Sequence, residues 1–408
     1  MSEPHHALAE IVRAEGTRIV ATLARTLGDL QSAEDAMQEA AVRALREWPR
    51  TGVPESPRAW LIVTARRAAI DRIRRESARA GKERAGMELI LPGDLPDTVV
   101  RDDQLRLIFT CCHPALSLPA QVTLTLRVLC GLDLPQIAAV LLTTESAVAK
   151  RLTRTRGKIA RARIPYRVPS DEELPQRLAA VCAVIHASYT AAHSRLGGDT
   201  VRDPGATREA VRLARLVQAA MPDEVMPAAV LALILLTEAR TPARLDEHGD
   251  PVILAEQDRT RWDRGLIAEG LRLLDRSLRR SGGVADPYQL QAAIAAEHAR
   301  AADYRDTDWA EIVRLYDLLL SVRPDDAARL ARAVAVAEAH GPAAGLSALD
   351  AMPRGPVTHR WQAVRAELLA RDGHLTEAAD GMRRALTPDV NAAERRYRER
   401  RIALWEQS

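Results

Sequence analysis

The sequence is poor in aromatic residues. Phe, Trp and Tyr together make up 3% of its 408 residues, with a single Phe. Proteins that hold single strands or RNA stack successive bases on aromatic side chains. An extensive stacking surface of that kind is therefore not expected.

Cysteine is also scarce, since only Cys111, Cys112, Cys130 and Cys182 occur. They form no CxxC pair and no disulfide-rich cluster, so a reducing cytosol is the simplest setting. Cys111, Cys112 and His113 are adjacent, but neighbouring side chains on a helix diverge by about 100° and chelate one ion poorly. We expect no metal and no other cofactor.

Long hydrophobic runs are missing. The most apolar stretch, Val225–Leu236, is about half the length that spans a bilayer, so it is expected to be a buried helix. The first residues lack a basic stretch followed by an apolar core, so no secretory signal is indicated. We expect a soluble, cytoplasmic protein with no membrane partner.

Strand patterns and catalytic motifs are missing as well. No alternating apolar run is bounded by turns, whereas apolar residues recur at three and four, so the predicted fold class is all-α. The chain contains no HExxH, no GxSxG, no Walker loop and no glycine-rich dinucleotide fingerprint. We therefore expect no catalytic residues and no enzyme activity.

Charge is distributed unevenly although the net charge is only +3. Residues 1–165 carry 25 Lys and Arg against 19 Asp and Glu, a balance of +6. Residues 166–408 carry 33 against 36, a balance of −3. The first part is the candidate for a polyanionic partner, although a difference this small also arises by compositional drift.

The chain divides into three predicted helical domains. The first covers 1–79, with helices expected near 6–27, 32–48 and 56–79. Residues 80–100 are rich in Gly, Pro and Asp and predict a linker. A second domain is expected at 101–165, and helix follows helix over 171–408.

The last predicted domain hints at a repeat. Gly341 and Gly373 each separate two helical stretches, 32 residues apart, and Pro324, Pro353 and Pro388 close successive units at spacings of 29 and 35. These spacings lie near the ~34-residue period of tetratricopeptide repeats. We predict a tetratricopeptide-like extension; an irregular helical bundle is the alternative.

Residues 133–159 predict a helix-turn-helix. Asp133 is placed to cap the first helix with Gln136 at the reciprocal position, and Thr143 or Thr144 caps the second, whose buried face holds Val148, Leu152 and Ile159, opposite Ile137, Val140 and Leu141. Such a helix fits the major groove of DNA, and the alternative is a solvated surface helix. The side chains predicted on its exposed side are Ser146, Lys150, Thr153, Arg154 and Arg156.

Two helices of the first domain carry charge in contrasting ways. Residues 32–48 are acidic in the first turns, with Ser32 as the predicted N-cap. Acidic side chains there complement the dipole of the helix, and the alternative is that they form a docking surface for a partner. Residues 56–79 are rich in arginine, which suits phosphate contacts or a solvated helix face. Those arginines are Arg66, Arg67, Arg72, Arg74 and Arg75.

Together these segments resemble an extracytoplasmic-function (ECF) sigma factor of bacterial RNA polymerase. The resemblance rests on Ala33–Glu39, Ala59–Arg66, Ala69–Arg75 and the helix-turn-helix. Further stretches resemble a subgroup with a long C-terminal tetratricopeptide-like extension. These are Leu107–Leu116, Glu256–Asp263, Pro287–Ala296 and Asp306–Trp309.

The resemblance implies roles for particular residues. Asp35, Gln38, Glu39 and Arg43 would bind the clamp helices of the largest subunit of core RNA polymerase. Residues 53–58 with Arg66, Arg67, Arg74 and Arg75 would read and open the minus-ten element, and the linker would pass near the RNA exit path. The minus-thirty-five element would be read by Ser146, Lys150, Thr153 and Arg154, with Arg156 also on promoter DNA.

One position departs from the family pattern. Where the family usually has Asn after Ala-Arg, this chain has Arg67. The contact usually attributed to that Asn is therefore not expected in the same form.

The resulting hypothesis is an alternative sigma factor that binds core RNA polymerase and promoter DNA. Its C-terminal extension would regulate transcription or bind a protein regulator, since helical repeats form extended binding surfaces. Two alternatives remain open: a stand-alone helix-turn-helix transcriptional regulator with a helical sensor domain, and a helical-repeat scaffold without DNA function. The segment 256–263 is expected to be structural, with a ligand or partner site as the alternative.

Overall fold

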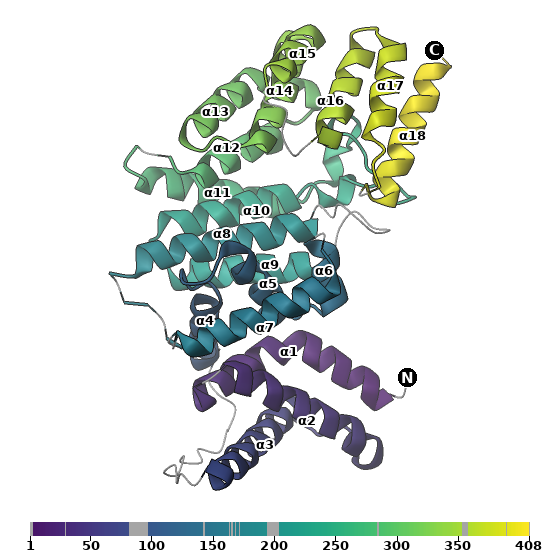
Figure 1. The fold of residues 1–408 in the computed structure, drawn as a ribbon. Helices are drawn as coiled ribbons and strands as arrows, with labels where there is room; N and C mark the ends of the chain where they lie inside the picture. The colour runs from purple at the N-terminus through teal and green to yellow at the C-terminus, as the bar shows by residue number, and fades with distance from the viewer. Residues whose placement is uncertain are drawn as a thin grey trace. The chain divides into compact units, whose positions relative to one another are not determined.

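A computed structural model gives the fold of the chain (Figure 1), which divides into two compact units, residues 1–188 and 189–408. Within the described residues the chain is helical, with one isolated bridge between Leu245 and Pro251 and no strand, so the predicted all-α fold is confirmed. The described residues are 3–28, 30–80, 97–141, 143–162, 164, 166–167, 169–170, 172–193, 204–283, 285–352, 358–388 and 390–407.

Unit 1 begins with a three-helix bundle. Its core is formed by alanines and large apolar side chains from all three helices, and Trp48 meets Trp60 edge to face with ring centroids 5.5 Å apart. Shorter helices follow, and the boundary with unit 2 falls within α8. The helices are α1 (Glu3–Leu27), α2 (Leu30–Thr51), α3 (Pro57–Ala80), α4 (Asp97–Cys111), α5 (Leu118–Val128), α6 (Leu134–Val140), α7 (Glu145–Arg161) and α8 (Leu174–His193).

The second helix is longer than predicted at both ends. It begins at Leu30, so Ser32 lies in its first turn and the predicted N-cap is wrong. It also continues through Pro49 to Thr51. Pro49 cannot donate a helical hydrogen bond, but it lies in the last turn, where few bonds follow it. The helix ends at Thr51, and Gly52 follows with a φ of 81°, the left-handed conformation that glycine adopts readily.

Unit 2 is a succession of helices that pack mainly on their neighbours in the chain. The predicted helix at 225–236 is confirmed as α10, and residues 227–236 are all buried. The stretch Val225–Ala243 is long and apolar enough to cross a membrane, but 61% of it is buried in the structure, as in a core helix. The helices are α9 (Pro204–Ala220), α10 (Val225–Glu238), η1 (Thr241–Ala243), η2 (Leu254–Glu256), η3 (Arg259–Arg261), α11 (Arg264–Arg280), α12 (Pro287–Arg300), η4 (Tyr304–Asp306), α13 (Trp309–Val322), α14 (Asp326–His340), α15 (Pro342–Asp350), α16 (Thr358–Arg371), α17 (Leu375–Ala385) and α18 (Ala392–Glu406).

The two glycines singled out in the sequence make tight turns between helices. Gly341 separates α14 from α15 and Gly373 lies between α16 and α17, both with φ of 90°. An L side chain rarely adopts this conformation, so glycine is the natural residue at each turn. The helix pairs are present as predicted.

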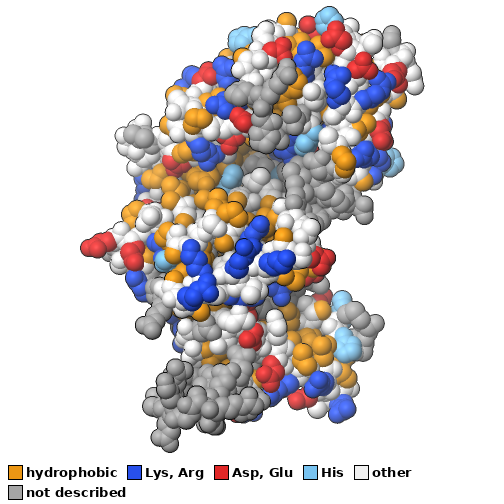
Figure 2. Space-filling view, viewed as in Figure 1, with side chains coloured by type: hydrophobic (Ala, Val, Ile, Leu, Met, Phe, Trp, Pro, Cys, Tyr) orange, Lys and Arg blue, Asp and Glu red, His pale blue; other side chains and the backbone are white. Residues whose placement is uncertain are grey.

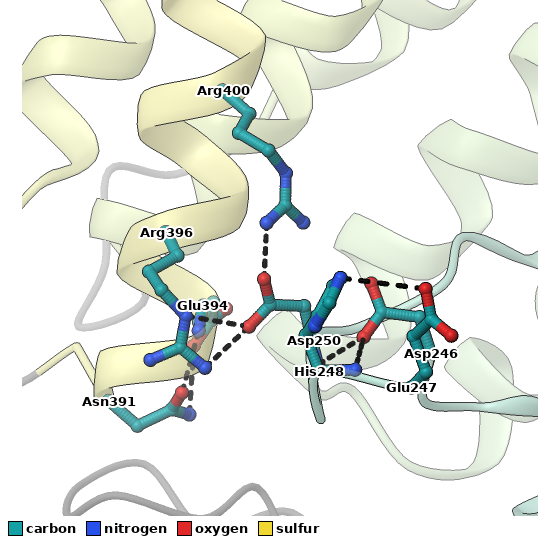
Figure 3. Close-up of polar contacts among 8 residues, drawn as sticks. All are labelled: Asp246, Glu247, His248, Asp250, Asn391, Glu394, Arg396 and Arg400. Atoms are coloured by element: carbon teal, nitrogen blue, oxygen red, sulfur yellow. Dashed lines mark hydrogen bonds and ion pairs between the residues drawn. The ribbon is translucent and has the colours of Figure 1, made fainter.

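The last helix is tied back to an earlier loop of the same unit (Figure 3). Asp250 lies between Arg396 and Arg400 of α18, accepts a 2.8 Å hydrogen bond from Arg396 Nε and pairs with the Arg400 guanidinium. Burial raises the pKa of Asp250, but the two guanidiniums outweigh it and hold that pKa below its usual range. We call this cluster of three residues the Asp250 clasp.

Candidate nucleic-acid interface

The helix-turn-helix is built as predicted, starting from its caps. Asp133 Oδ1 accepts from Gln136 N at 2.8 Å, and Gln136 Oε1 accepts from Asp133 N at 2.9 Å, which completes a capping box on α6. Thr144 caps α7, its hydroxyl accepting from Ala147 N at 3.2 Å. These caps fix where the two helices begin and so set the direction of α7.

The buried face of α7 also agrees with the prediction. Val148, Leu152 and Ile159 are all buried, as are Ile137 and Val140 of α6. Thr155 is buried on the same face and donates a 2.8 Å hydrogen bond to the carbonyl of Arg151. This helical hydrogen bond satisfies the hydroxyl, and the apolar spacing alone did not indicate it.

The opposite face of α7 is basic and exposed. Ser146, Lys150, Thr153 and Arg154 are exposed, as predicted. Figure 2 shows Lys and Arg side chains gathered where α7 lies. A helix-turn-helix whose second helix has an exposed basic face, and whose first helix packs against the buried face, has the form that enters a major groove.

Arg156 departs from the prediction. It was expected on the exposed face, but it is half-buried and makes a bidentate ion pair with Glu34 of α2, with Nε–Oε2 of 2.9 Å and Nη2–Oε1 of 2.7 Å. The expectation of exposure is wrong because Glu34 of α2 lies within hydrogen-bond distance of this side chain. Sequence spacing on one helix carries no information about such a neighbour.

A basic cavity of about 300 Å³ lies where α7 passes the start of α5. Arg151, Arg154 and Lys158 line it together with Ser117, which precedes α5 and makes no side-chain cap bond. A helix N-terminus carries partial positive charge and unpaired N–H groups. The cavity therefore has the chemistry to hold a phosphate, and Arg151 and Lys158 were not among the residues predicted for DNA.

The four residues predicted to bind polymerase share α2. Gln38 is exposed, whereas Asp35, Glu39 and Arg43 are half-buried. Arg43 pairs with Glu39 at 2.8 Å, and Asp35 accepts from Gln31 at 2.9 Å. The helix therefore presents a surface of mixed charge and amide groups.

The arginine helix α3 is docked through small and apolar residues, among them Leu61 and Ala65, both fully buried. Arg66 is half-buried and Arg67 is exposed. Arg74 and Arg75 belong to α3, but their side chains lie outside the described residues, as does that of Arg72. Of the predicted arginines, the structure therefore places Arg67 on the outside of the bundle and Arg66 partly within it.

The adjacent cysteines lie in the apolar core. Cys111, Cys112 and Cys130 are buried, and burial raises the pKa of Cys112 to about 12. His113 Nδ1 accepts from Ala115 N at 3.1 Å. In the described part of the chain, no group of three or more His, Cys, Asp or Glu residues is placed to hold a metal ion.

The charged segment 256–263 folds inward in unit 2. Arg259 is buried and donates to the carbonyls of His298 and Ala301, both at 2.8 Å, and to the hydroxyl of Thr307 at 3.0 Å. Its guanidinium also lies over the buried Trp262 ring, 4.8 Å from the centroid. These contacts give the segment a structural role in joining loops and helices.

Comparison with known families divides the chain into three matched parts. Residues 11–79 match the family described as Sigma-70 region 2, and residues 106–159 match Sigma-70, region 4. Residues 177–278 match a family of unknown function, DUF6596. The first part of the extension is therefore similar to a family without an assigned role.

Individual relatives agree with these matches. An uncharacterized protein of Rhizobium meliloti is 38% identical over 384 residues, 92% of this chain and 90% of that protein. The protein named Probable ECF RNA polymerase sigma factor SigI, in two strains of Mycobacterium tuberculosis, is 30% identical over 166 residues, 39% of this chain and 57% of that protein. No solved structure matches the chain.

Proposed function

We propose that the chain is an alternative ECF sigma factor, a DNA-binding transcription factor of the sigma-70 family that is not an enzyme and acts in the cytoplasm. In this proposal it binds core RNA polymerase and directs it to specific promoters. The observation that carries the proposal is the exposed basic face of α7, which stands on a capped helix-turn-helix in a chain that also carries region 2.

Each surface of unit 1 has a proposed partner. Asp35, Gln38, Glu39 and Arg43 on α2 contact the clamp helices of the polymerase largest subunit. Residues 53–58 and the arginines of α3 read and open the minus-ten element. The mixed polar surface of α2 and the outward position of Arg67 support these roles.

The helix α7 reads the minus-thirty-five element. Ser146, Lys150, Thr153 and Arg154 face the bases, and the basic cavity beside α5 takes a backbone phosphate. Phosphate contacts position a helix, whereas contacts with base edges supply sequence specificity. Arg156 reaches DNA only after it leaves Glu34.

The extension is proposed to be tetratricopeptide-like and to bind a protein regulator or the polymerase. The helix pairs α14–α15 and α16–α17, each turning at one glycine, support this assignment. Pro353 of the predicted repeat lies outside the described residues.

In vitro transcription with core polymerase tests the function. Replacing Lys150 and Arg154 together with Ala is expected to reduce promoter-specific transcripts by at least about tenfold, because each good base contact contributes about 1–3 kcal/mol. Arg272 and Arg276 are a matched control, since they are exposed and also four residues apart on a helix. Equal activity of the two double variants would contradict the proposal.

A binding experiment distinguishes the sigma factor from the alternative, a stand-alone helix-turn-helix regulator. The sigma factor binds promoter DNA tightly and specifically only with core polymerase. If the purified chain alone shifts a specific promoter fragment as strongly as the holoenzyme does, the regulator is favoured instead.

A further inference from the structure

Arg240 and Trp262 lie side by side in the interior of unit 2. The backbone N–H of Asp263 donates to the carbonyl of Ala239 at 2.9 Å, which holds the start of α11 against the end of α10. The guanidinium carbon of Arg240 lies 5.3 Å from the centroid of the Trp262 ring, and that of Arg259 lies 4.8 Å from it. Two positive charges therefore share one indole ring.

Arg240 has no carboxylate partner and no hydrogen-bond acceptor among the residues that the structure describes. Its Nε is buried, and its charged neighbours include the guanidiniums of Arg244 and Arg259. Burial and these two like charges lower the pKa of Arg240 to about 10, so the side chain is still charged at pH 7. Stacking on an indole compensates a guanidinium only in part, because the N–H groups in its plane still lack acceptors.

Three more buried nitrogen atoms around this indole are unpaired within the described part of the chain. Trp262 is only 3% exposed, and its Nε1–H donates to no acceptor. Arg259 donates through both terminal nitrogens, yet its Nε has no partner. The third atom is Nδ1 of His298, which can donate in one neutral tautomer. Burial and the charges of Arg240 and Arg259 lower the pKa of His298 to about 3, so its ring is neutral at pH 7.

Such a concentration of unpaired donors is unusual for the interior of a protein. Roughly 90% or more of buried polar groups are hydrogen-bonded, and a buried charge is costly unless it is paired. The unpaired groups of Arg240, Arg259 and Trp262 are all donors, and two of the three residues are positively charged. They share one requirement, which is an acceptor with negative charge.

Carboxylate and phosphate groups meet this requirement. A planar guanidinium donates two parallel hydrogen bonds to the oxygens of either group. Tyr316 of α13 adds a neutral hydroxyl, since burial raises its pKa to about 12 although the Arg240 charge lowers it. Arg240 is half-buried, so a small ion can reach it, whereas the buried Trp262 N–H excludes a bulky partner such as a protein surface.

We propose that unit 2 binds a small oxyanion, a carboxylate or phosphate group, at Arg240 and Trp262. The anion pairs with the Arg240 guanidinium and accepts a hydrogen bond from Trp262 Nε1. It also offsets the repulsion between Arg240 and Arg259, which the shared indole ring brings together. The inference goes beyond the proposed function and does not rest on it, because anion binding is measured in the chain without polymerase or DNA.

The test titrates the full chain with inorganic phosphate and, separately, with acetate, each replacing chloride at constant ionic strength. Tryptophan fluorescence and the temperature of unfolding are expected to change in a saturable manner, because an ion that binds only the folded state stabilises it. A response to phosphate alone assigns a phosphate group to the site, and a response to acetate alone assigns a carboxylate. If neither anion gives a saturable change, the proposal is overturned.

Two variants locate the bound anion. Arg240→Met keeps an apolar stem against the indole but removes the charge, and the apparent affinity is expected to fall at least about tenfold. Trp262→Phe keeps a ring but removes the N–H, and the affinity is expected to fall severalfold. The control is Arg272→Met with Arg276→Met, whose side chains are exposed in the same unit, and its affinity should equal that of the wild type.

The stability of Arg240→Met without added anion gives a second readout. Its unfolding temperature is expected to equal or exceed that of the wild type, because the substitution removes an unpaired buried charge. If this variant fails to fold, Trp262→Phe still tests the site. Equal anion affinity in the wild type and in every folded variant would place the anion elsewhere, such as the basic cavity beside α5, and would overturn the proposal.

Discussion

The joint between α14 and α15 in unit 2 differs from one in unit 1 in how closely the helices approach. We call the joint in unit 1 the seam: it consists of the contacts that α1 and α2 make with residues 97–170, among them Arg156–Glu34 and Arg25–Asp103. A Cβ atom added at Gly345 of α15 would lie 2.5 Å from Ala337 Cβ and 3.1 Å from the carbonyl of Ala333. In unit 1, by contrast, a cavity of about 850 Å³ lies beside the seam, with Val12 and Met37 on one side and Val128 on the other. One joint is close-packed around its glycine, and the other leaves an open cavity beside its polar contacts.

The difference follows from the residues at each joint. Between α14 and α15 these are Gly, Ala and Leu, whereas the polar contacts of unit 1 include Arg156–Glu34 and Arg25–Asp103. Close packing over the whole joint gains dispersion contacts that are lost at once on separation. Polar points exchange their partners for water at modest net cost. We therefore expect substitutions in unit 2 to cost more stability than substitutions in the seam.

The largest effect is expected at Arg259. Replacing it with Ala leaves the carbonyls of His298 and Ala301 without their donor and removes the contact with Trp262, so unit 2 should lose about 3 kcal/mol or more. Thermal unfolding should show a fall of roughly 6–12 °C. The neighbouring Arg261→Ala is the control, because Arg261 is exposed, and a similar fall there would contradict the structural role of Arg259.

The next effect tests close packing itself. Gly345→Ala should destabilise unit 2 by about 1–3 kcal/mol, since the new methyl group meets backbone as well as side chain. Gly157→Ala in α7 should instead stabilise by about 0.5–1 kcal/mol, because only the flexible end of Arg161 lies near. Denaturant titration measures the free energy of unfolding of both variants. A loss of stability in both would contradict the view that close packing at Gly345 causes the effect.

The Asp250 clasp should contribute less and should depend on pH. The pKa of Asp250 is lowered in the folded state. Its contribution to stability is therefore present above the pKa of the unfolded state and is lost as pH falls through the pKa of the folded state. Asp250→Asn should cost about 1–2 kcal/mol at pH 7. The difference in free energy of unfolding between wild type and variant, measured by denaturant titration at several pH values, should become smaller below a pH of about 4. A difference that stays constant from pH 7 to pH 3 would show that the carboxylate of Asp250 is not its source.

The smallest stability effect is expected in the seam. Glu34→Gln should change the free energy of unfolding by about 1 kcal/mol, because the ion pair is partly exposed and water replaces it readily. A loss as large as that at Arg259 would show that the seam is a permanent joint.

Local features of the fold were predictable from the sequence. The capping box at Asp133 and Gln136 and the buried stripe of Val148, Leu152 and Ile159 both follow from spacing along one helix. The same reasoning found the buried helix α10 from its uninterrupted apolar run. Caps and stripes are decided within a few residues, so no knowledge of the remaining chain is needed.

Contacts between distant segments were not predictable. Arg156 looked exposed because its partner, Glu34, lies 122 residues away. The Asp250 clasp could not be predicted for the same reason, since Arg396 lies 146 residues from Asp250 in the sequence. The segment 256–263 was recognisable as unusual, but only the structure shows Arg259 turned inward. The residue roles at polymerase and promoter, and the domain limits 1–79, 101–165 and 171–408, stay predictions.

Tyr166 has a consequence for the order of events during synthesis. Its hydroxyl reaches back 145 residues to Ala21. At about 5–20 residues per second, the ribosome needs roughly 4–17 s to extend the chain from residue 80, where α3 ends, to Tyr166. For that interval the nascent three-helix bundle lacks the Tyr166 contact, and its other partners, among them Asp103 and Arg156, arrive only one after another. Every newly made chain thus passes through an open form, before its own later segments arrive to cover α1 and α2.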